Sequence, residues 1–210
     1  KHIIIMIPNT WDKISTQQFM QFNALNKVKG KDAKDTMNIL IQKAAILSGL
    51  DMYEAEKIPI SELSNIKKLA EQGIKSKIYK SFQLNGIWYE VILNPNDLTS
   101  ERYAGVMEAS KVDPIQGIAK TLFYLCKPFK KGLFGRKYYE HKEGDIPKII
   151  EGFNDLPITI SYPIAVFFLT LLKEYTDYSL TYSKEKMTQM KEEILKAQAD
   201  LLKDTDGLKQ

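Results

Sequence analysis

The stretch FQLNGIWYEVILNP, residues 82–95, constrains the fold most, because a turn dipeptide lies between two segments typical of strands. Asn85-Gly86 is a dipeptide favoured in two-residue type I′ hairpin turns, where both central residues have positive φ. The flanking arms are rich in β-branched and aromatic residues, and Pro95 follows the second arm. We therefore predict an antiparallel hairpin over residues 78–93.

Most other segments have the apolar spacing of helices. Ser15 and Gln18 stand where a capping box starts a helix, and Thr99 stands at the N-cap of a helix after the hairpin. Residues 112–129, VDPIQGIAKTLFYLCKPF, read as another helix, and the β-branched run at residues 2–7 predicts a buried strand. The predicted fold class is α+β, predominantly α-helical, with a small antiparallel sheet of the N-terminal strand and the central hairpin.

The C-terminal segment has an apolar stripe of its own. Apolar residues recur at spacings of three and four in Met187, Met190, Ile194, Ala197 and Leu201. We predict one mostly helical globular domain over residues 1–182, followed by an amphipathic helix and tail over residues 183–210. The stripe packs either on the protein's own core or on another chain, a neighbouring subunit or a virion protein. The polar residues before it and its methionines favour the neighbouring subunit.

Composition excludes little. The chain has 30 basic and 26 acidic residues, a net charge of +4, which neither requires nor excludes a nucleic-acid partner. The single cysteine, Cys126, lies in an apolar run, where a small buried core residue is expected. The longest apolar stretch, residues 156–172, contains two prolines and is too short to cross a bilayer, so we expect no membrane partner.

Motifs for catalysis or cofactor binding are not found in the sequence. The chain has two histidines, and His141 stands among charged residues in YYEHKEGD, which predicts a solvated loop. Phosphate-binding glycine loops, Gly-x-Ser-x-Gly, Cys-x-x-Cys and His-Glu-x-x-His motifs do not occur. We therefore expect no enzyme activity, no cofactor and no metal site.

Residues 127–142 form the most charged segment. Six basic residues face one acidic residue there, a net charge of +5, and four aromatic residues are interleaved. We predict a loop, which could contact a phosphate backbone, dock on an acidic protein surface, or remain solvated with its aromatic rings in the core. Together with the C-terminal stripe, it supplies the candidate partner-contact residues: Lys127, Lys130, Lys131, Phe134, Arg136, Lys137, Met187, Met190, Ile194 and Leu201.

Several segments in order resemble a known class of proteins: IPNTW, ILSGLD, IPISEL, FQLNGIWYEVILNPNDLTSERY and LPITISYPIAVFFLTLLK. They are similar to small proteins from the structural gene modules of tailed bacteriophages, in the head–tail or tail-assembly region, some of them tail-assembly chaperones. The resemblance spans residues 3–172. It implies no catalytic residues.

The resemblance implies a virion structural or assembly protein that acts through multivalent protein–protein contacts. Its partners would be other virion proteins and further copies of the chain, and its location the virion, assembled in the host cytoplasm. Two alternatives stay open. One is a cytoplasmic binding or regulatory module that contacts nucleic acid weakly through the basic segment. The other is an enzyme with an unrecognised site.

Overall fold

A computed structural model describes residues 7–75, 77–111, 115, 117–133, 135–173 and 186–188. The chain divides into two compact units, Lys1–Phe167 and Phe168–Gln210. The predicted fold class is confirmed: the protein is α+β, predominantly helical, with a four-stranded antiparallel sheet. The domain boundary predicted at residue 182 lies outside the described residues and stays a prediction.

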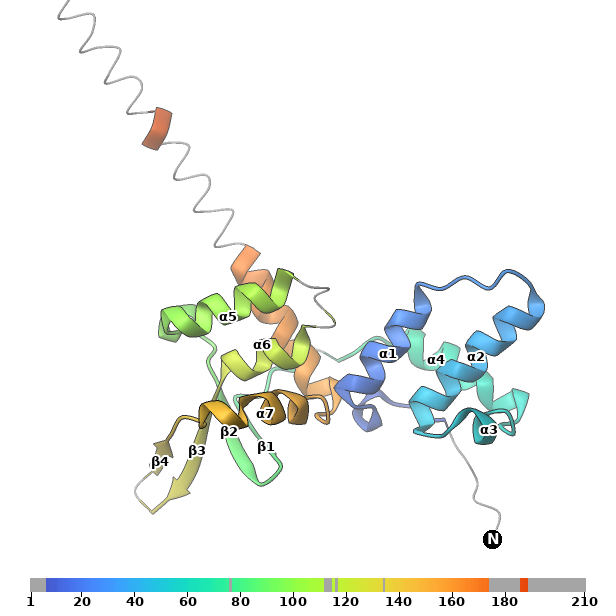
Figure 1. Cartoon of the computed structure of the whole chain (residues 1–210), viewed down its shortest axis with the longest axis horizontal. Coiled ribbons are helices and arrows are strands. Elements are labelled where there is room, and N and C mark those ends of the chain that lie inside the picture. Colours follow the sequence, from blue (N-terminus) through green and yellow to red (C-terminus); the bar gives the residue numbers. More distant parts are fainter. Residues whose placement is uncertain are drawn as a thin grey trace, which may run out of the picture. The chain divides into compact units, whose positions relative to one another are not determined.

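The first part of the chain is helical (Figure 1). After a short 3₁₀ helix at Trp11–Lys13, the elements are α1 (Thr16–Asn26), α2 (Ala33–Ser48), α3 (Met52–Ala55) and α4 (Ile60–Gln72). Helix α2 contacts the other three. The capping box at the start of α1 is confirmed, since Ser15 Oγ accepts from Gln18 N and Gln18 Oε1 accepts from Ser15 N.

The sheet follows. Its strands are β1 (Ser81–Leu84), β2 (Ile87–Val91), β3 (Cys126–Gly132) and β4 (Gly135–Tyr138), paired in that order. The predicted turn at Asn85-Gly86 is confirmed, because both residues have positive φ, 49° and 79°. The N-terminal strand predicted at residues 2–7 lies outside the described residues except for Ile7, which is buried and belongs to no strand.

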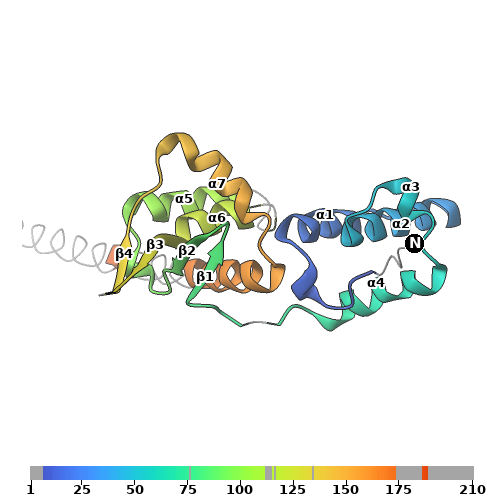
Figure 2. The same cartoon turned by 90° about the horizontal axis from the view of Figure 1, so that it is seen from below.

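Three helices accompany the sheet: α5 (Ser100–Lys111), α6 (Ile118–Leu125) and α7 (Ile146–Phe153). Short 3₁₀ turns at Pro95–Asp97 and Glu143–Asp145 precede α5 and α7. Helix α6 lies between α5 and α7 and runs into β3 (Figures 1 and 2). Its approach to α5 is close, because a Cβ on Gly105 would lie 2.4 Å from the ring of Tyr124. Residues 158–173 form a further helix.

Two sequence predictions for residues 112–142 are wrong. The helix ends at Leu125 instead of Phe129, and the predicted basic loop is largely the hairpin β3–β4. Pro128 disfavours continuation of the helix, because proline lacks an N–H and clashes with the preceding turn. Pro128 is compatible with the strand, because the carbonyl and the N–H of one strand residue face the same neighbour. Its carbonyl accepts from Tyr139 N at 3.3 Å, so the missing N–H would also face Tyr139, and no bond to β2 is lost.

Distant parts of the chain meet at the start of α1. Thr16 N donates to Leu156 O at 2.8 Å, and Ile158 N donates to Ile14 O at 2.8 Å. The Thr16 hydroxyl also contacts Leu156 O at 2.9 Å and Ser161 Oγ at 2.6 Å, and both hydroxyl-bearing residues are fully buried. These bonds join residues 140 and 145 positions apart, so they fix α1 against the start of the helix at residues 158–173.

We expect Thr16→Val to lower the free energy of unfolding by about 1–3 kcal/mol, because Ser161 and the Leu156 carbonyl lose a buried partner. Thr16→Ser keeps the hydroxyl and serves as the control, with a smaller loss from one deleted methyl group. Urea unfolding followed by circular dichroism measures both. A Thr16→Val protein as stable as the native one would show that this hydroxyl network contributes nothing.

Candidate interaction surface

The four strands give the sheet two unlike faces. The side chains of Phe82, Leu84, Tyr89, Val91, Cys126 and Pro128 are buried on one face, which we call the inner face. Phe82 and Tyr89 pack there against Phe153 of α7, with ring centroids 6.4 and 5.1 Å apart. The opposite face, which we call the outer face, has more exposed residues and begins with Ser81 and Gln83.

A row of three aromatic rings crosses the outer face. The strand register places Trp88 of β2 opposite Phe129 of β3, and Phe129 opposite Tyr138 of β4. The ring centroids are 6.1 Å apart in the first pair and 6.0 Å in the second. Phe129 is only 2% exposed although it lies on this face. The row therefore attaches the hairpin β3–β4 to β2.

Two cations of the outer face, Lys131 and Arg136, already have partners. Lys131 Nζ lies 3.4 Å from the centroid of the Trp88 ring, and the Arg136 guanidinium lies 4.8 Å from that of Phe129. Glu90 forms an ion pair with Arg136 and accepts a hydrogen bond from the Tyr138 hydroxyl. That hydrogen bond raises the pKa of Tyr138. Arg136 is therefore neutralised within the protein, and Lys131 is held over an aromatic ring.

Two lysines at the end of the inner face are different. Lys130 and Lys137 lie directly opposite one another on β3 and β4, and both are exposed. Lys130 Nζ lies 5.7 Å from the Tyr139 ring, but among the described residues neither lysine forms an ion pair. Like charges placed directly opposite on neighbouring strands repel each other. An anion would relieve this repulsion, so this pair is the hairpin's main candidate for a partner contact.

The other predicted contact residues divide into two groups. Lys127 is half-buried on the outer face, opposite Glu90 in the register. Met187 is helical and 60% exposed. The remaining candidates, Phe134, Met190, Ile194 and Leu201, lie outside the described residues, as does most of the predicted C-terminal helix. The structure thus brings together the basic residues of the hairpin, with Lys130 and Lys137 separated by face from Lys131 and Arg136.

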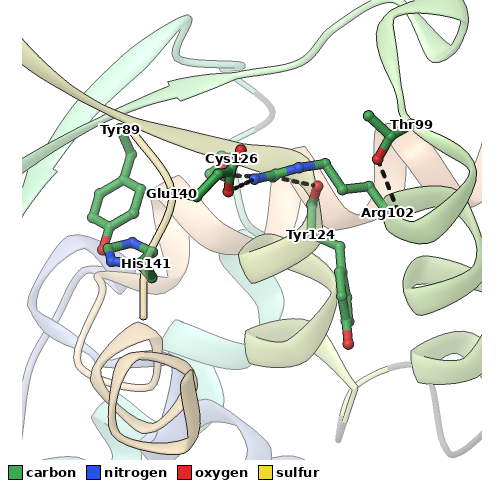
Figure 3. Close-up of polar contacts among 7 residues, drawn as sticks. All are labelled: Tyr89, Thr99, Arg102, Tyr124, Cys126, Glu140 and His141. Atoms are coloured by element: carbon green, nitrogen blue, oxygen red, sulfur yellow. Dashed lines mark hydrogen bonds and ion pairs between the residues drawn. The ribbon is translucent and has the colours of Figure 1, made fainter. Parts of the chain in front are cut away.

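Arg102 holds the base of the hairpin in place (Figure 3). Its guanidinium donates to the carbonyls of Tyr124 and Cys126 at 3.1 and 3.0 Å, and to Glu140 Oε2 at 2.9 Å. The carbonyl between them, on Leu125, accepts from Ile92 N at 2.8 Å. The last carbonyls of a helix have no intrahelical partners, so these bonds allow α6 to pass directly into β3 without a loop.

His141 is not in a solvated loop, contrary to the sequence prediction. It is half-buried, and its Nε2 lies 3.2 Å from the Tyr89 hydroxyl (Figure 3). Its ring also lies near those of Phe123 and Tyr139. Burial lowers the pKa of His141 and raises that of Tyr89 to about 12. The pair lines a pocket of about 320 Å³ that also includes Asp145 and Lys148.

The structure places Cys126 where the sequence predicts it. Cys126 is 2% exposed, and burial raises the pKa of its thiol, so the protonated form dominates at neutral pH. Within the described ranges, no three His, Cys, Asp or Glu side chains come together as a possible metal site. No helix in that part of the chain is both long and apolar enough to span a bilayer.

Comparisons of the chain with protein-family models, with curated proteins and with solved structures find no match.

We expect Arg102→Met to lower the free energy of unfolding by about 1.5–3 kcal/mol, because the carbonyls of Tyr124 and Cys126 lose a charged donor at a nearly buried position. Glu140→Gln is the matched control. The Glu140 side chain is 75% exposed, so a loss below about 1 kcal/mol is expected. Equal losses in the two variants, measured by urea unfolding, would contradict a special role for the carbonyl contacts.

Stability should depend on pH through His141. Its pKa in the folded protein lies below the ordinary value of 6.5, so the unfolded chain binds the proton more readily. The contribution of neutral His141 is present above pH 6.5 and is lost as the pH falls through the folded-state pKa. Arg102 also lowers the pKa of His141, whereas Glu140 and Asp145 raise it. The control variant must therefore keep these three charged residues.

The measurement compares urea unfolding of the native protein and His141→Gln from about pH 7.5 to about pH 5. The native protein should lose more stability than the variant as the pH decreases, since the carboxylates contribute equally to both. Identical slopes would mean that His141 titrates alike in the folded and unfolded chains.

Proposed function

We propose that this protein is a non-enzymatic assembly protein of a tailed-bacteriophage structural module, binding other virion proteins in the head–tail region through its basic hairpin. The observation that supports this most directly is the exposed pair Lys130 and Lys137, two facing cations without an anionic partner among the described residues. The sequence resemblance to phage head–tail and tail-assembly proteins supplies the context, with the virion as the location.

A binding role suits the hairpin better than a catalytic one. Four of its five cations, Lys130, Lys131, Arg136 and Lys137, are exposed, whereas Lys127 is half-buried next to Cys126, which is itself buried. Cys126 is buried and protonated, and His141 is engaged with the Tyr89 hydroxyl. Several copies of the chain, each adding one modest contact, would together give an assembly useful affinity.

One observation favours a second candidate, weak binding of nucleic acid. Tyr138 is 47% exposed and is adjacent in sequence to Lys137, and a basic surface with an accessible ring is typical of single-strand binding. Such binding would weaken steeply with salt. The engagement of the Tyr138 hydroxyl with Glu90 argues against it, since the ring is already fixed beside Phe129.

Reversing both lysines, Lys130→Glu with Lys137→Glu, should weaken binding to the virion partners by about tenfold or more while the fold is retained. Co-purification with head–tail proteins of a tailed bacteriophage, followed by titration of the pairs that form, measures the loss. The matched control is Lys34→Glu with Lys68→Glu, two exposed helix lysines with the same change in charge.

Equal binding by the two double variants, or no virion protein bound by the native chain, would contradict the proposed function. Salt-dependent binding of an oligo(dT) strand that only Lys130→Glu with Lys137→Glu abolishes would favour the second candidate instead.

A further inference from the structure

Strand β4 lies at an edge of the sheet and is exposed along its whole length. The strand order places β3 on one side of it and no strand of the described chain on the other. All four of its residues, Gly135 to Tyr138, are exposed. Such an edge offers unpaired backbone groups to another extended chain.

The hydrogen-bond pattern identifies which of these backbone groups are free to pair. Tyr139 N donates to Pro128 O, so residue 139 bonds inward to β3. Bonding alternates along an antiparallel strand, so Lys137 and Gly135 also turn inward, opposite Lys130 and Gly132. The N–H and C=O groups of Arg136 and Tyr138 therefore turn outward, away from β3.

The charges at this edge select the occupant. A second copy of β4 in antiparallel pairing would set Lys137 opposite Lys137 when Arg136 pairs with Tyr138, and Arg136 opposite Arg136 in the other register within the strand. Like charges directly opposite are destabilising in both registers. An acidic strand would instead set its carboxylates beside Lys137, which has Lys130 on its other side. The alternate residues of the incoming strand would lie beside Arg136 and Tyr138. Arg136 is already paired with Glu90, so apolar side chains suit these positions.

We propose that the β4 edge accepts an extended segment of a partner protein as a fifth strand, with acidic residues alternating with apolar ones. The acidic residues lie on the Lys130 and Lys137 side, and the apolar residues lie on the Tyr138 side. This inference rests on the proposed function and specifies how the partner is held: its backbone bonds to Arg136 and Tyr138, and its carboxylates set the register.

Proline at position 138 tests the backbone contact. Because the Tyr138 N–H faces outward, Tyr138→Pro removes a donor from the edge and leaves the bonds between β3 and β4 in place. Tyr138→Ala is the matched control, since both variants lose the ring and the hydroxyl contact with Glu90. Circular dichroism and thermal melting establish that the two fold alike.

The probe is a short fluorescein-labelled peptide of alternating glutamate and valine, titrated by fluorescence anisotropy. A peptide of the same composition with its glutamates in one block is the control for charge alone. We expect Tyr138→Ala to bind the alternating peptide and Tyr138→Pro to bind it at least about tenfold more weakly. Lys137→Glu should lose binding, and the block peptide should bind the native protein more weakly than the alternating one.

A second measurement needs no variant and covers the case in which Tyr138→Pro does not fold. Hydrogen exchange of the native protein should show the Arg136 and Tyr138 amides protected when the alternating peptide is added. Unchanged exchange at both amides, equal binding by Tyr138→Pro and Tyr138→Ala, or equal binding of the two peptides would overturn the proposal. Preferential binding of oligo(dT), insensitive to proline at 138, would overturn it in favour of nucleic acid.

These outcomes are separable from the proposed function. If reversal of Lys130 and Lys137 disrupts virion complexes but Tyr138→Pro matches Tyr138→Ala in them, the assembly role stands and strand addition is wrong. If no virion protein binds but the alternating peptide adds to the edge, strand addition stands and the assembly role is wrong.

Discussion

The arrangement of the sheet depends on one side chain, Arg102. Thr99 caps the start of α5 by accepting from Arg102 N at 3.3 Å, which places Arg102 in the first turn. From there its guanidinium reaches two carbonyls at the junction of α6 and β3 and the carboxylate that follows β4. Three elements, α5, α6 and β3, and the segment after β4 thus meet at one planar cation, whose donors are spaced for several acceptors at once. The direction of β3, and with it the position of the basic hairpin, follows from this junction.

The hairpin itself combines repulsion with compensation. Its register sets Lys130 opposite Lys137 and Lys131 opposite Arg136, two pairs of like charge that oppose strand formation. On the outer face the cost is offset, because the rings of Trp88 and Phe129 lie beneath Lys131 and Arg136 and Glu90 neutralises the arginine. In the described chain Lys130 Nζ lies 5.7 Å from the Tyr139 ring, but no carboxylate forms an ion pair with Lys130 or Lys137. The same hairpin therefore has one side that stabilises the fold and one side suited to a partner.

Local signals were sufficient for part of this structure. Asn85-Gly86 identifies the first hairpin because positive φ at two residues is a property of the dipeptide itself, and Ser15 with Gln18 identifies the start of α1 for a similar reason. The segment KPFKKGLFGRKYY has no such signal, since its lysines have low strand propensity and its glycines suggest a loop. Its aromatic row exists only in a register with Trp88, about forty residues earlier in the chain. His141 was misplaced for the same reason, because its partner Tyr89 is 52 positions away.

Lysine and arginine on an edge strand commonly hinder its pairing with another chain. On β4 these side chains act differently on basic and on acidic partner strands. Basic side chains disfavour pairing with another copy of the same strand, because it would set Lys137 opposite Lys137 or Arg136 opposite Arg136. They do not exclude an acidic strand, and Lys130 and Lys137 favour it. In the proposed strand addition, the same charges would disfavour self-association and favour a heterologous acidic partner. The proposed assembly role requires both properties, because such a protein would have to stay unpaired until its partner binds.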